Sequence, residues 1–346
     1  MCKEDTSKIM LENISNAVED FKIDPSMLYK GNCFISLDGV DCSGKGSITK
    51  IIEEKGIDGV KVKRVDFPQY DLPSGEMIKS FLNGEGIYGN YLKYMNSVPY
   101  EGLRPMEWHA VVSGRSENLY KMIEFVSHLY SINRVEYFMR NEIEPGTVYI
   151  FDRYQYSNVI HQFSNISSYF CEGDGAELLA IRWRASKEHK DVTYEEFVMD
   201  HVYGDIKKMY DKMLKYERKY GVYDTFKFLL LITENEVRER LEKRKDSKHE
   251  GRDILEENDA IHRACKFVNL KNSDFHMING CVPISVDEFK YDNDKIAEFI
   301  VNSYKFAIKN NFTSDDNDLP GLVIPMALNG IDCGCVEDCE CGDCEQ

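Results

Sequence analysis

One stretch decides the fold of this chain, Cys33-Phe-Ile-Ser-Leu-Asp-Gly-Val-Asp-Cys-Ser-Gly-Lys-Gly-Ser47. It opens with a short apolar run that predicts a buried strand, continues through a Gly-x4-Gly-Lys loop, and leads into a helical pattern at residues 48–55. This order is typical of a P-loop, in which backbone N–H groups and the positive end of the helix dipole bind phosphate. The sequence therefore predicts an ATP site, with Lys45 reaching the β- and γ-phosphates, formed by Gly39, Val40, Asp41, Cys42, Ser43, Gly44, Lys45, Gly46 and Ser47.

The residue after the P-loop lysine departs from the usual pattern. Most P-loops place Ser or Thr there, and its hydroxyl holds Mg²⁺, whereas this chain has Gly46, with Ser47 one residue later. The pattern resembles the loops of adenylate kinases and of polyphosphate-using kinases. We therefore expect Mg²⁺ to be held mainly by phosphates, water, Ser47 and a carboxylate from elsewhere in the chain.

Composition describes a globular protein with a large core. The 346 residues are 42% hydrophobic and 30% charged. The sequence holds no apolar run of about eighteen residues, and its N-terminal stretch is polar and acidic, so we expect a cytoplasmic protein without a membrane span or signal peptide. The net charge of −17 disfavours polymeric nucleic acid as a partner, because that binding needs a basic face.

Strands and helices are expected to alternate along the chain. The pattern predicts further strands at 60–67, 147–151, 226–232 and 275–278, and helices at 75–82, 116–141, 194–218, 234–245, from the charged loop at 243–252 to about 270, and 287–308. The spacing of apolar residues between 9 and 21 predicts a short N-terminal helix laid on the main domain. Such alternation indicates an α/β fold, with a parallel sheet covered by helices on both faces.

The domain organisation follows from changes in composition. We expect one P-loop kinase domain at residues 31–310, preceded by an N-terminal extension at 1–30 and followed by an acidic tail at 311–346. Within the domain we expect an irregular insertion at about 84–115, a second insertion at about 164–193 and a lid at about 243–256. Nine acidic residues and no Lys or Arg follow Lys309. The tail also carries five of the eleven cysteines, at 333, 335, 339, 341 and 344, and is interpreted as a disordered acidic segment or as a site for a thiophilic metal.

An acid and an arginine follow the strand predicted at 147–151. Asp152-Arg153 comes directly after this apolar run, and the carboxyl ends of parallel strands meet at one edge of a sheet, where ligands bind. Asp152 is therefore a candidate for holding Mg²⁺ through water, and Arg153 for binding a second phosphate. A simple ion pair at the end of a strand is the alternative.

Five motifs in order resemble those of thymidylate kinases, which transfer the γ-phosphate of ATP to dTMP. They are Asp38-Gly-Val-Asp-Cys-Ser-Gly-Lys45, Phe67-Pro-x5-Ser-Gly-x2-Ile78-x3-Leu82, Ser131-Ile-Asn-Arg-x-Glu136, Asp152-Arg-Tyr-x2-Ser157-x4-Gln162, and Glu236-x3-Arg-Leu-x2-Arg244 with Arg252-Asp-x2-Glu256. The resemblance covers about 33–82, 116–162 and 216–300. It does not cover the N-terminal extension, the two insertions or the tail.

The resemblance implies roles for individual residues. Asp41 would contact the deoxyribose 3′-hydroxyl and the transferring phosphate, Tyr130 would stack on thymine, and Arg134 would hydrogen-bond its carbonyl edge. Arg153 would bind the dTMP phosphate. The remaining positions would line the substrate and metal pocket: Phe67, Tyr70, Asp152, Ser157 and Gln162. The alternative to a stacking role for Tyr130 is that it is simply one more aromatic residue in a helix core.

Two departures from the family pattern bear on the chemistry. The P-loop has Cys42 where one subtype has arginine, so the cation at the transferred phosphoryl group must come from the lid, with Arg244, Lys248 and Arg252 as candidates. After Phe67-Pro68, where many members clamp the monophosphate with arginine, this chain has Gln69-Tyr70. An insertion residue would then take over the clamp, with Arg104, Arg115 and Arg182 as candidates.

The sequence thus predicts a nucleoside monophosphate kinase that uses ATP and Mg²⁺ on dTMP or a related deoxypyrimidine monophosphate. A polyphosphate- or nucleoside-using P-loop kinase is the rival enzyme, and a non-catalytic kinase-like binding protein is the rival from another class. Because the family commonly dimerises through helices, we also expect a homodimer.

Overall fold

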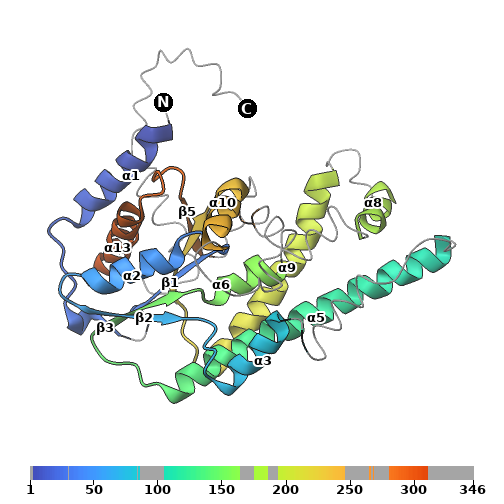
Figure 1. Cartoon of the computed structure of the whole chain (residues 1–346), viewed down its shortest axis with the longest axis horizontal. Coiled ribbons are helices and arrows are strands. Elements are labelled where there is room, and N and C mark those ends of the chain that lie inside the picture. The colour runs from blue at the N-terminus through green and yellow to red at the C-terminus, as the bar shows by residue number, and fades with distance from the viewer. Residues whose placement is uncertain are drawn as a thin grey trace, which may run out of the picture.

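A computed structural model describes residues 3–29, 31–83, 85, 105–163, 175–185, 194–245, 265, 268 and 280–310. Its centre is a five-stranded, all-parallel sheet in the order β2-β3-β1-β4-β5 (Figure 1). The strands are β1 (Phe34–Gly39), β2 (Lys61–Asp66), β3 (Thr147–Asp152), β4 (Phe226–Leu231) and β5 (Cys281–Ser285). The α/β fold with a parallel sheet and a P-loop between its first strand and helix, predicted from the sequence, is confirmed.

Helices connect the strands and cover both faces of the sheet (Figure 1). They are α1 (Lys3–Val18), α2 (Lys45–Lys55), α3 (Pro73–Leu82), α5 (Pro105–Arg140), α6 (Gln155–Asn158) with a π-helical turn over Val159–Phe163, α8 (Gly175–Ala185), α9 (Tyr194–Lys219), α10 (Glu234–Lys245) and α13 (Asn293–Lys309), besides a short 3₁₀ turn at Pro25–Met27. The N-terminal helix α1 packs against α13, where the Asn302 amide donates to the hydroxyl of Ser15 at 3.0 Å.

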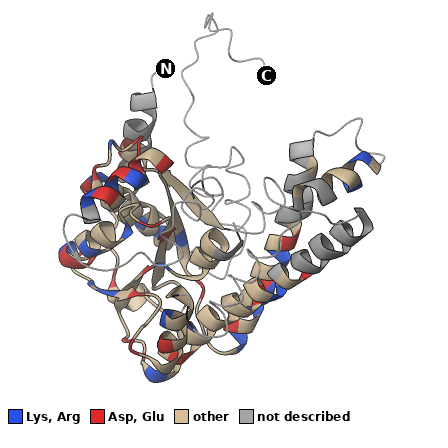
Figure 2. Ribbon diagram, turned by 45° about the vertical axis from the view of Figure 1, so that its right-hand side comes forward, with Lys and Arg blue, Asp and Glu red and all other residues tan. Residues whose placement is uncertain are grey.

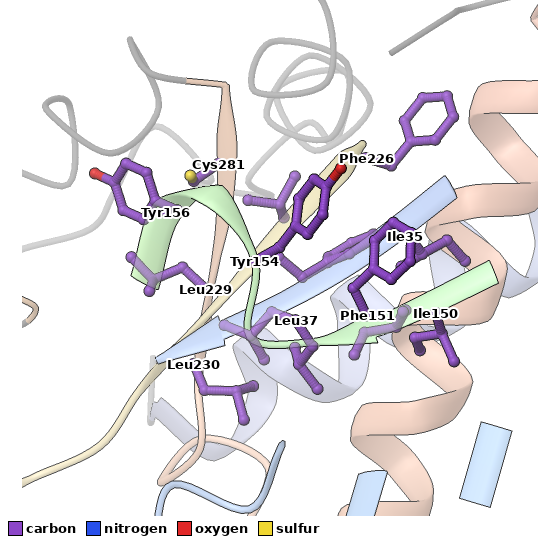
Figure 3. Close-up of a cluster of buried hydrophobic side chains, with 14 of the residues drawn as sticks. Ile35, Leu37, Ile150, Phe151, Tyr154, Tyr156, Phe226, Leu229, Leu230 and Cys281 are labelled. Carbon is purple, nitrogen blue, oxygen red and sulfur yellow. The ribbon is translucent and has the colours of Figure 1, made fainter. Parts of the chain in front are cut away.

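The core forms because the central strands are apolar on both faces. Every residue of β1 is buried, and its alternate side chains point to opposite sides of the sheet. On one face of the sheet Phe34 contacts Phe138 of α5, and on the opposite face Phe226 of β4 contacts Tyr304 of α13. Figure 3 shows this cluster around β1, β3 and β4. Its packing fixes the strand ends from which the polar loops project.

Helix α5 begins earlier than predicted. The sequence placed residues 84–115 in an irregular insertion, but α5 already starts at Pro105. Proline is favoured in the first turn of a helix, where its missing N–H costs nothing. The second insertion, whose sequence pattern is weak, contains α8.

The last strand was not predicted. The strand expected at 275–278 lies outside the described residues, whereas β5 covers Cys281–Ser285. Pro283 lies within β5, which is at the edge of the sheet, where proline is tolerated. The last helix begins at Asn293 rather than at 287, because Lys290 and Tyr291 have left-handed backbones and Asp292 caps the helix.

Candidate active site

The P-loop leaves the N-terminus of α2 open toward the carboxyl edge of the sheet. Helix α2 begins at Lys45, and its N-cap Gly44 has a positive φ of 105° and no side chain with which to cap the helix. The first N–H groups of a helix have no acceptor within it. An N-terminus of this kind, with its helix dipole, is suited to binding an anion.

Lys45 is buried within the loop that it serves. Its Nζ donates to the carbonyl oxygens of Gly39 at 2.9 Å and Val40 at 2.6 Å, and it lies 3.4 Å from the hydroxyl of Ser43. Burial lowers the pKa of Lys45, and Asp41 is among the acidic groups that oppose this shift. The ammonium group thus lies inside the loop between residues 39 and 43.

The two strand-end loops meet through Arg153. This residue follows β3 with a positive φ of 64°, which is uncommon for a side chain with a Cβ. Its backbone N–H donates to the carbonyl oxygen of Leu37 at 3.1 Å, and its guanidinium pairs with the carboxylate of Asp41 in the P-loop. The Asp41 charge is the main reason that the pKa of Arg153 is raised. The P-loop and the Asp152-Arg153 loop therefore face one another.

Asp38 holds the β3 loop in place from inside the sheet. Its Oδ1 accepts from the backbone N–H of Tyr154 at 2.9 Å and from the hydroxyl of Ser157 at 2.5 Å. The side chain is fully buried, and among the described residues its Oδ2 has no hydrogen-bond partner. Burial raises the pKa of Asp38 despite these hydrogen bonds. Asp38 thus fixes the residues that follow Arg153.

Asp152 lies against the P-loop at Gly46. A Cβ added to Gly46 would be 3.1 Å from Oδ2 of Asp152 and 3.6 Å from Nη2 of Arg64. The Asp152 carboxylate and the exposed hydroxyl of Ser47 are hard oxygen donors, which fit Mg²⁺. Within the described parts of the chain, no group of three or more His, Cys, Asp or Glu side chains forms a ready metal cage.

Two tyrosines lie near Arg153. Tyr70 and Tyr130 both contribute to the raised pKa of Arg153, and both rings pack against an apolar cluster formed by α3 and α5. Asn133 fixes the loop that carries Tyr70, because its amide accepts from the backbone N–H of Gln69 at 2.7 Å and donates to the carbonyl oxygen of Gln69 at 3.0 Å. Tyr70 and Tyr130 are therefore brought together beside Arg153.

Arg134 is buried in an ion pair that the sequence did not predict. Its Nε and Nη2 donate to Oε1 of Glu217 at 3.1 and 2.5 Å, and the two side chains are only 2% and 0% exposed. Ser131 and Gln155 donate to the same carboxylate at 2.5 and 2.9 Å. Among the described residues, Nη1 of Arg134 makes no hydrogen bond. Glu217 thus orients Arg134 and leaves one of its nitrogens for another acceptor.

His161 lies in the π-helical turn behind the two loops. Burial lowers its pKa to about 4, so the imidazole is neutral at pH 7. The charges of Asp41, Arg153 and Lys45 also act on this pKa, which places His161 close to all three. His161 belongs to no motif by which it could be singled out from the sequence alone.

Some predicted site residues lie elsewhere. Phe67 is buried in the core, where its ring contacts Tyr137, Phe151 and Tyr154, so it supports the site from behind instead of lining it. The side chains of Gln162 and Arg244 and all of Arg252, with the rest of the lid beyond 245, lie outside the described residues. The same holds for Lys248, Arg104, the side chain of Arg115 and the tail cysteines, whereas Arg182 is described and exposed on α8.

Arg240 of α10 reaches the P-loop instead. Its Nη1 donates to the carbonyl oxygen of Cys42 at 3.1 Å, its Nε donates to Glu236 at 2.7 Å, and its guanidinium lies 5.3 Å from the ring centre of Tyr291. The motif that contains Arg240 was recognised in the sequence, but its contact with the loop was not foreseen. It forms the wall of the P-loop opposite Asp152.

Comparisons with known proteins add little to this geometry. No family model and no curated protein matches the chain. Among solved structures it is similar to a thymidylate kinase from Candida albicans, with 16% sequence identity over 79% of this chain and 93% of that chain, and a TM-score of 0.40. A TM-score this low carries no argument. The fold therefore rests on the strand order, and the function on the site.

The charged residues of the described part of the chain are mixed in sign. Lys and Arg are interspersed with Asp and Glu over its helices (Figure 2). No helix in the described part of the chain combines the length and the apolar character needed to cross a bilayer.

Proposed function

We propose that the protein is a nucleoside monophosphate kinase of the thymidylate kinase type, which transfers the γ-phosphate of ATP to dTMP or a related deoxypyrimidine monophosphate. One observation carries the proposal: the Arg153–Asp41 ion pair joins the loop that would bind the donor to the loop that would bind the acceptor. Two phosphate-binding loops in contact are what a direct transfer between two nucleotides requires.

Each part of the site has a role in this reaction. The P-loop amides and Lys45 would bind the donor phosphates, with Lys45 leaving the carbonyl oxygens that it now contacts. Arg153 would release Asp41 and bind the acceptor phosphate, which frees Asp41 for the sugar hydroxyl. Mg²⁺, held by Asp152 and Ser47 together with the phosphates, would offset the charge that develops on the transferred group. Arg244 or Arg252 of the lid would supply a further cation.

The acceptor base would lie between Tyr130 and Arg134. Glu217 holds the Arg134 guanidinium rigidly by two of its nitrogens, so Nη1 is a fixed donor for a base carbonyl. Tyr70 and Ser157 would bound the sugar and phosphate, and Gln162 the remaining edge. A neutral His161 beside Arg153 adds no further charge to the pocket at pH 7.

The test is a panel of nucleoside monophosphates incubated with ATP and Mg²⁺ and scored for diphosphate. We expect dTMP or another deoxypyrimidine monophosphate to react best, and Lys45→Ala to abolish transfer without unfolding the protein. Arg153→Ala should raise KM for the monophosphate more than KM for ATP. Transfer from polyphosphate instead of ATP, or to thymidine instead of dTMP, would favour the rival kinases. No transfer to any acceptor would favour a binding protein.

We also propose that the enzyme is a homodimer formed through α5. Three apolar side chains of this helix, Phe125, Ile132 and Met139, are 40%, 43% and 77% exposed and follow one another at intervals of seven residues. Residues seven apart lie on one stripe of a helix and suit packing against another helix. A second copy running antiparallel, with its two-fold axis at Ile132, would pair Phe125 with Met139 of the partner subunit.

The charges beside this stripe are complementary to themselves in the same arrangement. The axis at Ile132 would bring Glu124 of each copy opposite Arg140 of the other copy. Such self-complementarity is what an isologous interface requires. Sedimentation velocity tests it: Ile132→Glu should give monomers, whereas the same substitution at exposed Ile181 of α8 should leave the dimer intact.

A further inference from the structure

The corner of the P-loop beside Gly46 contains a cation that the proposed reaction does not use. Arg64 of β2 points its guanidinium at Asp152, with 3.1 Å between Nη2 and Oδ2. The side chains are 22% and 14% exposed, so solvent screens this pair much less than an ion pair on the surface. The second carboxylate on Arg64, Asp66 at 2.7 Å, is 62% exposed.

Arg64 is held at this corner from several sides. Its backbone N–H donates to Oε1 of Glu53 on α2 at 2.9 Å, which ties β2 to the helix that begins at the P-loop. The parallel register places Asp66 directly opposite Asp152, and Arg64, two residues earlier, is on the same face of the sheet. Its Nε is buried and, among the described residues, has no hydrogen-bond partner. The guanidinium is therefore placed by the fold.

The position that this pair occupies is the one a P-loop hydroxyl would otherwise fill. A Cβ on Gly46 would be 3.1 Å from Oδ2 of Asp152, tighter than nine in ten real Cβ contacts, and 3.6 Å from Nη2 of Arg64. A serine or threonine there would push the carboxylate aside by a few tenths of an ångström. The glycine and the Arg64–Asp152 pair are thus two parts of one arrangement.

We propose that Arg64 is a positioning residue that acts through Asp152 and sets the affinity of this corner for divalent cations. The inference rests on the proposed function, which assigns Mg²⁺ to Asp152. Without nucleotide, the guanidinium neutralises the carboxylate and disfavours a free cation there. When a nucleotide binds, its phosphates offer Arg64 another acceptor, and Asp152 becomes available to the metal that arrives with them. The site therefore takes up metal together with nucleotide, and not before it.

Binding of Mn²⁺ alone, followed by electron paramagnetic resonance without nucleotide, tests the inference. The guanidinium of Arg64 repels a cation that approaches Asp152 and lies 3.1 Å from Oδ2, an oxygen that the metal would need. We therefore expect Arg64→Met and Arg64→Gln to bind Mn²⁺ about tenfold more tightly than the wild type. Arg64→Lys, which keeps the charge, should bind it as weakly as the wild type. A purely structural role for Arg64 predicts weaker binding in all three variants.

Two controls separate the local effect from net charge. Lys63→Met removes one positive charge from the neighbouring position of β2, where Lys63 contacts Glu144 and not Asp152, and should leave Mn²⁺ binding unchanged. Asp152→Asn combined with Arg64→Met should bind Mn²⁺ no better than Asp152→Asn alone. No gain in Arg64→Met and Arg64→Gln, or an equal gain in Lys63→Met, overturns the inference.

The proposed function is tested separately on the same protein. Calorimetry of ADP binding to the wild type without metal reports on the P-loop, in a chain whose Arg64 is unchanged. If ADP fails to bind, the nucleotide site is wrong. If ADP binds and the Arg64 variants do not change Mn²⁺ affinity, only the role of Arg64 is wrong.

Discussion

The buried Arg134–Glu217 pair gives the sharpest test of the site's construction. Replacing Arg134 by Met removes the only cation hydrogen-bonded to the Glu217 carboxylate among the described residues. Breaking such a pair costs about 3–5 kcal/mol, because one charge stays buried without compensation. Glu217→Met leaves Arg134 uncompensated in the same way, and we expect a similar loss from it.

The double variant should lose much less than the sum of the two. Replacing both partners of a buried pair by apolar groups is often close to neutral. Ser131 and Gln155, which donate to Glu217, would each lose an acceptor at a cost of about 1–3 kcal/mol. We therefore expect a coupling free energy of about 2 kcal/mol or more between Arg134 and Glu217.

Urea unfolding at pH 7, followed by circular dichroism, measures the three free energies. Kinetics of Glu217→Gln, which keeps a hydrogen-bond acceptor but removes the charge, adds a functional reading. KM for the acceptor nucleotide should rise while KM for ATP stays the same, because Arg134 is loosened and the P-loop is not. Additive stability losses, or an equal change in the two KM values, would refute the reasoning.

Three further predictions concern residues around the same loops. As the pH falls, His161 of the unfolded chain binds a proton near pH 6.5, whereas His161 of the folded chain binds one only near pH 4. The free energy of unfolding of the wild type should therefore fall by about 3 kcal/mol over this window, and that of His161→Gln should not. Denaturant unfolding from pH 4 to 7 measures both. Gly75→Ala should lower Tm by several degrees, since its Cβ would lie 2.2 Å from the carbonyl oxygen of Gln69 and 2.6 Å from Cα of Tyr70, both backbone atoms. Burial raises the pKa of Asp38, so folding disfavours its charged form, which predominates in the unfolded chain above the ordinary pKa of aspartate. Asp38→Asn should therefore raise the free energy of unfolding at pH 7 and have little effect near pH 3. An equal effect at both pH values would contradict this cause.

The elements that form the site could be predicted because their sequences are locally decisive. An apolar run, then glycines and a lysine, then a helical pattern leaves few alternatives, and β1 and α2 form where expected. The same holds for β3, which ends at Asp152. Parallel strands place their carboxyl ends together, so the meeting of Lys45 and Arg153 followed from topology alone.

The supporting residues could not be predicted, because long-range packing selects them. Glu217 lies on α9 among many Lys and Glu residues, and nothing local shows which carboxylate is buried against Arg134. Arg64 lies in a strand whose alternation of charged and apolar residues breaks at Lys63-Arg64, but this break does not show which carboxylate Arg64 pairs with. Asp38 carried a weak signal, since a carboxylate inside an apolar strand needs partners, but Tyr154 and Ser157 are more than a hundred residues away.

In the proposed reaction, the contacts of Asp38 and Asp41 would couple the donor site to the acceptor site. Asp41 belongs to the donor loop yet pairs with Arg153, and Asp38, at the start of the same loop, accepts hydrogen bonds from the residues after Arg153. An acceptor phosphate that takes Arg153 therefore frees Asp41 and changes the charge around Lys45, which already responds to both. A coupling free energy is reciprocal. The factor by which the acceptor changes the affinity for the donor therefore equals the factor by which the donor changes the affinity for the acceptor.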